Sequence, residues 1–228
     1  MTTVLLPATV RNRLPRNHSP QCHASRCRAL AWLDQRGRAA LFIGVLLALL
    51  VSIAPSMAGA AERLITTTGV GTVQLGMSLD AARAATPGFI LSESVDAVGD
   101  GYVAVAEDDI ILMRLFADAG DLGPTVDWHA AIVAIEVLAP SYRTTAGVSP
   151  QSPLAEVAQA YGPLIRIRRS EIDRQEYALF ANQPLNLVLR VDGGSEGSEA
   201  GIYLPGTDMT ERFRLGARIA SITVQQAL

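Results

Sequence analysis

Apolar and polar residues alternate along this chain in short runs, which are separated by turn-forming residues. After residue 64, eight of these runs have the length and the apolar content of β-strands. The runs begin at Phe89, Tyr102, Ile110, Ala131, Leu164, Tyr177, Leu185 and Arg218. Asp108 and Asp109 lie between the second and third runs, at the expected tip of a tight hairpin. We therefore expect a domain in which strands outnumber helices.

Two segments, residues 78–86 and 152–162, have helical periodicity instead. Each places three apolar residues on one face, namely Leu79, Ala82 and Ala85 in the first and Leu154, Val157 and Tyr161 in the second. Ser78 and Ser152 precede these segments, and a serine at this position accepts a hydrogen bond from the first turn of a helix. A proline and a glycine follow each segment and end the pattern. The sequence thus predicts two short helices, each capped by a serine.

The order of one helix and then four strands occurs twice, and some residues match between the two copies. Leu79 matches Leu154 at an offset of 75 residues. The pattern I-x-x-I-x-V begins at Ile132 and again at Ile219, an offset of 87 residues. Self-similarity on this scale is typical of duplicated units.

The larger second offset indicates an insertion in the second copy, and the glycine-rich acidic loop at residues 192–201 is the natural place for it. We therefore expect an α+β fold of two tandem units, each a short helix followed by an antiparallel sheet of about four strands. The first unit would occupy residues 61–145 and the second residues 146–228.

The first 60 residues have a different composition from the rest. Seven arginines and a single acid precede an uncharged apolar run at residues 39–54, and the small-residue pattern A-G-A follows at residues 58–60. This combination is typical of a secretory signal peptide, which predicts that residues 61–228 are periplasmic or secreted. The alternative is an uncleaved anchor that holds the domain outside the cytoplasm. The apolar run is shorter than the roughly 20 residues that span a bilayer.

The stretch G-T-V-Q-L-G-M-S, residues 71–78, has the glycine spacing of a phosphate-binding loop, but Met77 occupies the position of the required lysine. The chain contains no lysine at all, so P-loop, Schiff-base and Ser-Lys mechanisms are excluded. We interpret the stretch as a short strand and a turn that lead into the first helix.

Charge and cysteine usage narrow the choice of partners. Residues 61–228 contain 21 acids and 12 arginines, a net charge of −9, so nucleic acid is not an expected partner. The two cysteines, Cys22 and Cys27, lie in the leader near His18 and His23, at spacings that match no familiar zinc motif. We expect neither a metal nor a cofactor, and a membrane partner only if the leader is retained.

Candidate catalytic residues are few. His129 is the only histidine after residue 60, and no G-x-S-x-G elbow accompanies it. The acids at residues 107–109 and 118–127 are expected in solvated turns, and their spacing does not fit a calcium loop. Two of them brought together would instead support an alternative function, a carboxylate-dependent hydrolase acting on cell-envelope material.

Binding residues form a second class of candidates. Arginines alternate with apolar residues after Leu164, as in an edge strand protected by charge or in a binding strip. Loops at the helix entrances offer further candidates. The residues that we expect to contact a partner are Trp128, His129, Tyr142, Arg143, Arg166 and Arg168.

The stretch L-G-M-S-L-D-A-A-R-A-A at residues 75–85, followed by a meander and repeated once, resembles the tandem modules of beta-lactamase inhibitor proteins. It is also similar to the small lipoproteins of the outer-membrane barrel-assembly machinery, and residues 142–162 resemble stretches of uncharacterised exported bacterial proteins. The resemblance covers about residues 65–228. The chain departs from the first two families because residues 61–228 contain no cysteine for disulfides or for lipid attachment.

The two named families bind other proteins, so the resemblance implies binding rather than catalysis. Together with the missing lysine and the single histidine, it leads us to expect an exported, non-enzymatic protein that binds another protein or an envelope component. An assembly module attached to the membrane is a further alternative, which would sediment with membranes on fractionation.

Overall fold

The computed structural model describes residues 63–118, 123–195 and 198–226. The expected leader, residues 1–60, lies outside the described residues. The described residues belong to one compact unit. Among them, the hydrophobic core runs from Ile65 to Val224. Within the described ranges, no helix has the length and apolar character needed to cross a membrane.

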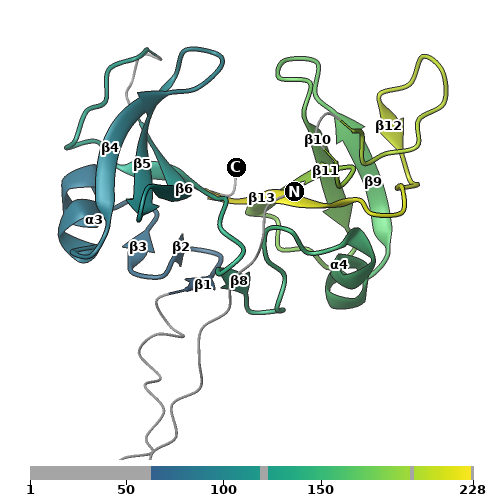
Figure 1. Cartoon of the computed structure of the whole chain (residues 1–228), viewed down its shortest axis with the longest axis horizontal. Coiled ribbons are helices and arrows are strands. Elements are labelled where there is room, and N and C mark those ends of the chain that lie inside the picture. Colours follow the sequence, from purple (N-terminus) through teal and green to yellow (C-terminus); the bar gives the residue numbers. More distant parts are fainter. Residues whose placement is uncertain (1–62, 119–122, 196–197, 227–228) are drawn as a thin grey trace, which may run out of the picture. The chain divides into compact units, whose positions relative to one another are not determined.

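All eight predicted strands are present, and they belong to one sheet (Figure 1). They are β4 (Ile90–Val95), β5 (Gly101–Glu107), β6 (Ile110–Ala117), β7 (Ile132–Val137), β9 (Leu164–Arg169), β10 (Glu176–Phe180), β11 (Leu187–Asp192) and β13 (Arg218–Gln225). With β12 (Met209–Thr210), the order is β12-β9-β10-β11-β13-β7-β6-β5-β4. The α+β class is confirmed, but the strands of the two expected units share one nine-stranded sheet rather than forming two sheets.

A smaller sheet has the order β3-β2-β1-β8. Its strands are β1 (Leu64–Ile65), β2 (Gly69–Val70), β3 (Val73–Gln74) and β8 (Arg143–Thr144). The expected strand and turn at residues 71–78 are confirmed as β3 followed by Gly76, which has a φ of 84°. A positive φ is accessible to glycine at little cost, which explains the second glycine of this stretch.

The predicted helices are α3 (Leu79–Ala85) and α4 (Leu154–Tyr161). The Ser78 Oγ accepts a hydrogen bond from the Ala81 amide at 3.2 Å, so the predicted cap of α3 is confirmed. The predicted cap of α4 is wrong, because Pro153 is its N-cap and makes no side-chain capping bond. Ser152 turns away from the helix, and its Oγ accepts from the Ser149 amide at 3.0 Å.

A residue in the turn that leads into each helix makes an equivalent backbone hydrogen bond to the large sheet, to β7 in the first half of the domain and to β13 in the second. The Gly76 amide donates to the Ile132 carbonyl at 2.8 Å, and the Gln151 amide donates to the Ile219 carbonyl at 2.8 Å. These donors are 75 residues apart and these acceptors 87, the offsets seen in the sequence. Gly76 and Gln151 also share a positive φ, 84° and 72°.

The pattern I-x-x-I-x-V is explained by a β-bulge that occurs in both β7 and β13. In β7, Ile132 pairs with Ala117 and Ala134 with Phe116, so Val133 has no partner on β6. In β13, Ala220 is left out of the pairing with β11 in the same way. An extra residue lets two isoleucines three positions apart face the same side of the sheet, where both are buried.

The two halves join where β7 pairs with β13 in antiparallel register. Ile135 lies opposite Val224, and Val137 lies opposite Ile222. In the 87-residue offset, Ile135 corresponds to Ile222 and Val137 to Val224. When each residue is replaced by its counterpart in the other half, the pair Ile135–Val224 therefore becomes the pair Ile222–Val137. The junction therefore has the arrangement of an isologous contact between two similar units.

Candidate functional site

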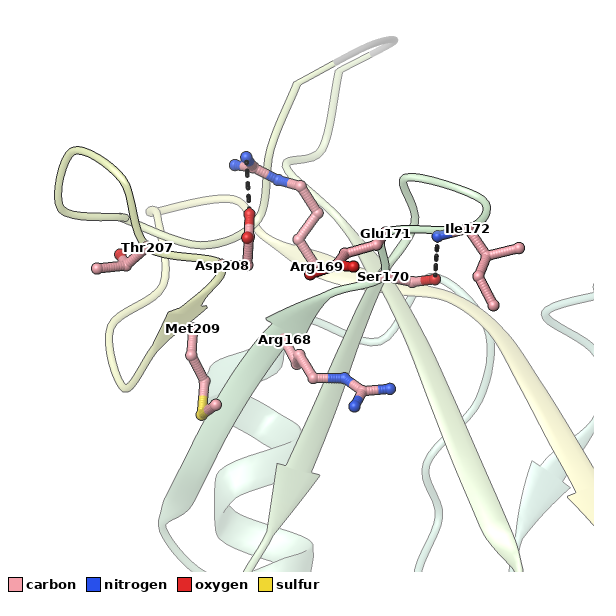
Figure 2. Close-up of a pocket in the computed structure, with 8 residues that line it drawn as sticks. All are labelled: Arg168, Arg169, Ser170, Glu171, Ile172, Thr207, Asp208 and Met209. Atoms are coloured by element: carbon pink, nitrogen blue, oxygen red, sulfur yellow. Dashed lines mark hydrogen bonds and ion pairs between the residues drawn. The ribbon is translucent and has the colours of Figure 1, made fainter.

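The second half carries a surface at the edge of the nine-stranded sheet, where β12 lies against β9. We call it the β9–β12 surface, defined by Ile165, Arg166, Arg168, Ile202, Leu204 and Met209. Two cavities of about 580 and 590 Å³ open on it, and Met209 lines both. Figure 2 shows the first cavity, with Met209 on one side and Arg168 on the other. Two of the six predicted binding residues, Arg166 and Arg168, thus line these two cavities.

The second cavity lies where β12 separates from β9. Met209 pairs with Arg168 and Thr210 with Ile167, and the pairing then stops. The Arg212 carbonyl instead accepts a hydrogen bond from the Ile202 amide at 2.9 Å. The start of β9 therefore has no strand on its outer side, and the cavity occupies that place.

The β9–β12 surface is apolar as well as basic. Its four apolar side chains are exposed, from 37% for Ile202 to 74% for Leu204. Ile165 is exposed because it is the extra residue of a bulge and has no strand partner on β10 or β12. Sequence reasoning missed Ile202, Leu204 and Met209, since they lie in the longer second-half connection between β11 and β13, outside the predicted strands.

Arg166 and Arg168 differ from their neighbour in β9. Among the described residues, neither has an ion-pair partner, whereas Arg169 pairs with Glu199 and with Asp208. Figure 2 shows the Arg169 side chain directed toward Asp208 and the Arg168 side chain extending away from that pair. The guanidinium groups of Arg166 and Arg168 are therefore available to a partner.

One buried carboxylate holds the segment that forms a wall of the second cavity. Glu176 is 6% exposed, and it accepts hydrogen bonds from the Ala200 amide at 2.6 Å and the Gly201 amide at 2.9 Å. The Tyr203 hydroxyl donates to the same carboxylate at 2.6 Å. Burial, together with this bond to a carboxylate, raises the pKa of Tyr203 well above its usual value. The hydroxyl therefore stays protonated and remains a donor.

Trp128 and His129 lie beside α3, and Trp128 contacts β4. β4 forms the edge of the large sheet opposite the one that carries the β9–β12 surface. The Trp128 Nε1 donates to Glu93 at 2.6 Å, and the Arg83 guanidinium lies 3.5 Å from the centre of the Trp128 ring. The His129 Nδ1 is 3.2 Å from an Asp80 carboxylate oxygen, and its side chain is 89% exposed. The pair forms a separate surface cluster.

Tyr142 is placed differently from the expectation. Its side chain is 1% exposed and belongs to the hydrophobic core, so it offers no surface to a partner. Burying its aromatic ring removes a large apolar area from water, which favours a place in the core although the residue lies in a loop. Arg143 is exposed on β8, and its Nη1 donates to the Gly147 carbonyl at 3.2 Å.

Asp121, one of the candidate acids of a hydrolase, lies outside the described residues, and Glu107 and Asp127 make separate contacts. Glu107 pairs with Arg63 at 3.2 Å, and Asp108 and Asp109 form the predicted hairpin tip with φ of 48° and 65°. Asp127 accepts a hydrogen bond from the His129 amide at 2.9 Å. Within the parts of the chain that the structure describes, no group of three His, Cys, Asp or Glu residues could hold a metal ion.

A further cavity, of about 530 Å³, lies over the middle of the large sheet and is lined by Arg114, Glu136 and Arg190. Glu136 pairs with Arg114 at 3.2 Å and with Arg190 at 3.3 Å. It also accepts a hydrogen bond from the buried Ser221 hydroxyl at 2.7 Å. Glu136 pairs with both arginines, so this network connects strands of both halves.

No protein-family model matches this chain, and no curated protein matches it. Among solved structures, it is similar to the crystal structure of the uncharacterized protein yfeY from Escherichia coli, with 14% sequence identity and a TM-score of 0.48. The match covers 71% of this chain and 99% of that chain. A likeness this low carries no argument about function, and the expected family resemblances stay predictions.

Proposed function

We propose that residues 61–228 form an exported, non-enzymatic protein that binds another protein or an envelope component through the β9–β12 surface. The observation that carries the proposal is the position of Arg166 and Arg168, which have no ion-pair partner among the described residues, beside exposed apolar side chains. The domain has a net charge of −9, so this basic strip differs in sign from the molecule as a whole.

The composition of the surface supports binding to a protein. Arginine and methionine are enriched at protein interfaces, and arginines at the centre of an interface often contribute much of the binding energy. A contiguous group of exposed apolar side chains is also typical of an interaction site. The two cavities beside Met209 offer pockets for side chains of a partner.

Export is proposed from the leader, with its arginine-rich start, its apolar run and its small residues. We also infer that the domain arose by duplication of a helix-and-four-strand unit. The matching hydrogen bonds at Gly76 and Gln151 and the matching bulges at Val133 and Ala220 support this inference. The connection between β11 and β13 is the longer copy, and it supplies three of the six residues that define the β9–β12 surface, Ile202, Leu204 and Met209.

The proposal is tested by affinity capture with residues 61–228 from an envelope extract. The wild-type domain is compared with the double variant Arg166→Glu/Arg168→Glu, and captured proteins are identified by mass spectrometry. We expect a specific partner whose recovery falls at least about tenfold in the variant, since tenfold corresponds to about 1.4 kcal/mol and like charges brought together in an interface cost several kcal/mol.

Arg143→Glu is the control, because it makes one substitution of the same kind at an exposed position on the smaller sheet. It should leave capture unchanged. If the double variant retained its partner while Arg143→Glu, or a change at Trp128 or His129, lost it, the β9–β12 surface would be the wrong site. Hydrolysis of an envelope substrate that depended on one acid would contradict the non-enzymatic assignment.

A further inference from the structure

The two edges of the large sheet differ. One edge is closed by β12, which has only two residues and lies next to the arginines of β9 (Figure 1). The other edge is β4, which has six residues and pairs with β5 alone among the described strands. β4 contains no proline and no basic residue, and its pairing with β5 shows no register shift. Of the usual features that prevent an edge strand from pairing with another chain, it has a single charge, that of Glu93.

The direction of the free backbone groups follows from the pairing with β5. The Asp96 amide donates to the Asp100 carbonyl at 2.9 Å, which fixes the alternation of bonded pairs along this hairpin. Even-numbered residues of β4 then exchange hydrogen bonds with β5. The N–H and C=O groups of Leu91, Glu93 and Val95 point away from β5. No described strand lies there to pair with them.

We propose that β4 binds an extended peptide segment of another protein, which adds to the sheet as an antiparallel strand and carries a basic residue opposite Glu93. Glu93 is the one charged residue of β4, and it is exposed. One of its carboxylate oxygens accepts from Trp128 at 2.6 Å, which holds the side chain on this strand. Leu91 and Val95 flank it on the same face and favour apolar residues two positions to either side of the basic one.

A second copy of this chain fits the edge less well. A symmetric antiparallel pair of β4 strands that uses all the free groups of Leu91, Glu93 and Val95 would set Glu93 opposite Glu93 of the second copy. Like charges directly opposite each other destabilise a sheet. The net charge of −9 adds to the repulsion between copies and attracts a basic segment.

The test uses residues 61–228 labelled with ¹⁵N and a peptide with the sequence threonine-valine-threonine-lysine-threonine-valine-threonine. Titration should shift the amide signals of Leu91, Glu93 and Val95 and slow their hydrogen exchange. The same peptide with glutamate in place of lysine should bind at least about tenfold more weakly, because a favourable cross-strand pair becomes a repulsive one. N-methylation of the two valines and the lysine should abolish binding.

Glu93→Gln keeps an acceptor for Trp128 and removes the charge, so it should reduce the preference for the lysine peptide about tenfold. Glu156→Gln, an equal change at an exposed position in the first turn of α4, should have no effect. Equal binding of both peptides, shifts confined to other strands, or no shift in β4 at saturating peptide would overturn the proposal. Self-association that protects the same amides would also overturn it, by making a second copy the occupant. The β9–β12 surface is untouched by these variants, so the two proposals fail separately.

Discussion

The carboxylate of Glu176 gives the sharpest prediction about stability. It is 6% exposed, and its three hydrogen bonds join β10 to the segment that carries Ile202 and Leu204. Three hydrogen bonds to a charged group, at about 1.5–3 kcal/mol each, set an upper limit of about 4.5–9 kcal/mol. Alanine also removes the desolvation cost of the buried carboxylate, so Glu176→Ala should lower the free energy of unfolding by about 4 kcal/mol at neutral pH. That is a large part of the 5–15 kcal/mol typical of a domain.

Glu176→Gln should cost less, about 2 kcal/mol. The amide oxygen can still accept from the Gly201 amide and the Tyr203 hydroxyl, which share one carboxylate oxygen. The amide nitrogen then faces the Ala200 N–H, a donor that contacted the other oxygen at 2.6 Å. Urea unfolding of residues 61–228 measures both changes, and hydrogen exchange at Ala200 and Gly201 reports whether the wall loosens locally.

Glu199→Gln is the matched control, because it removes a carboxylate from the same segment at a half-exposed position paired with Arg169. It should cost less than about 1 kcal/mol. If Glu176→Ala cost no more than Glu199→Gln, the three hydrogen bonds would not be holding the segment and the reasoning would be refuted.

Two further predictions concern local structure. Ser78→Ala should lower the free energy of unfolding by about 1 kcal/mol, because it removes the cap of α3. Ser152→Ala should leave the start of α4 unchanged, because Ser152 does not cap that helix. Urea unfolding measures the loss of stability, and hydrogen exchange of the helix amides shows whether each helix start has changed. Burial acts to raise the pKa of Asp173, but hydrogen bonds from Tyr177 and the Gln175 amide lower it below 3.8 overall. The pKa of Asp173 is thus lower in the folded than in the unfolded state, so its carboxylate stabilises the protein above pH 3.8 and loses this contribution as the pH falls through the lowered pKa. Asp173→Asn should abolish this pH dependence of stability, which an acid titration followed by NMR measures.

Local features of the fold could be predicted because they depend on neighbours in sequence. The three-residue spacing of Leu79, Ala82 and Ala85 describes one face of a helix whatever it packs against. The alternation in each strand and the two aspartates at the hairpin tip are local in the same sense. The cap of α4 was predicted wrongly, because the Ser152 Oγ accepts a hydrogen bond from the Ser149 amide instead of from the first turn of the helix.

The candidate site could be predicted only in part. Arg166 and Arg168 were visible as an alternating basic strip, but their apolar neighbours Ile202, Leu204 and Met209 lie in a connection without periodicity. Tyr142 was predicted at the surface because it lies in a loop, but its side chain is buried in the core. A carboxylate such as Glu176 is expected at the surface until its three donors, all more than 20 residues away, are known.

The sequence by itself determined the number and order of the main helices and strands, and its pattern I-x-x-I-x-V contained the bulge in both halves. Only the tertiary structure decided that β7 pairs with β13, so that the two sets of strands form one sheet. It also decided that the pairing of β12 with β9 stops before Ile165 and that no described strand pairs with the outer edge of β4. The physical reason is range: side-chain periodicity and turn sterics act within a few residues, whereas strand pairing and burial depend on groups that only the folded chain brings together.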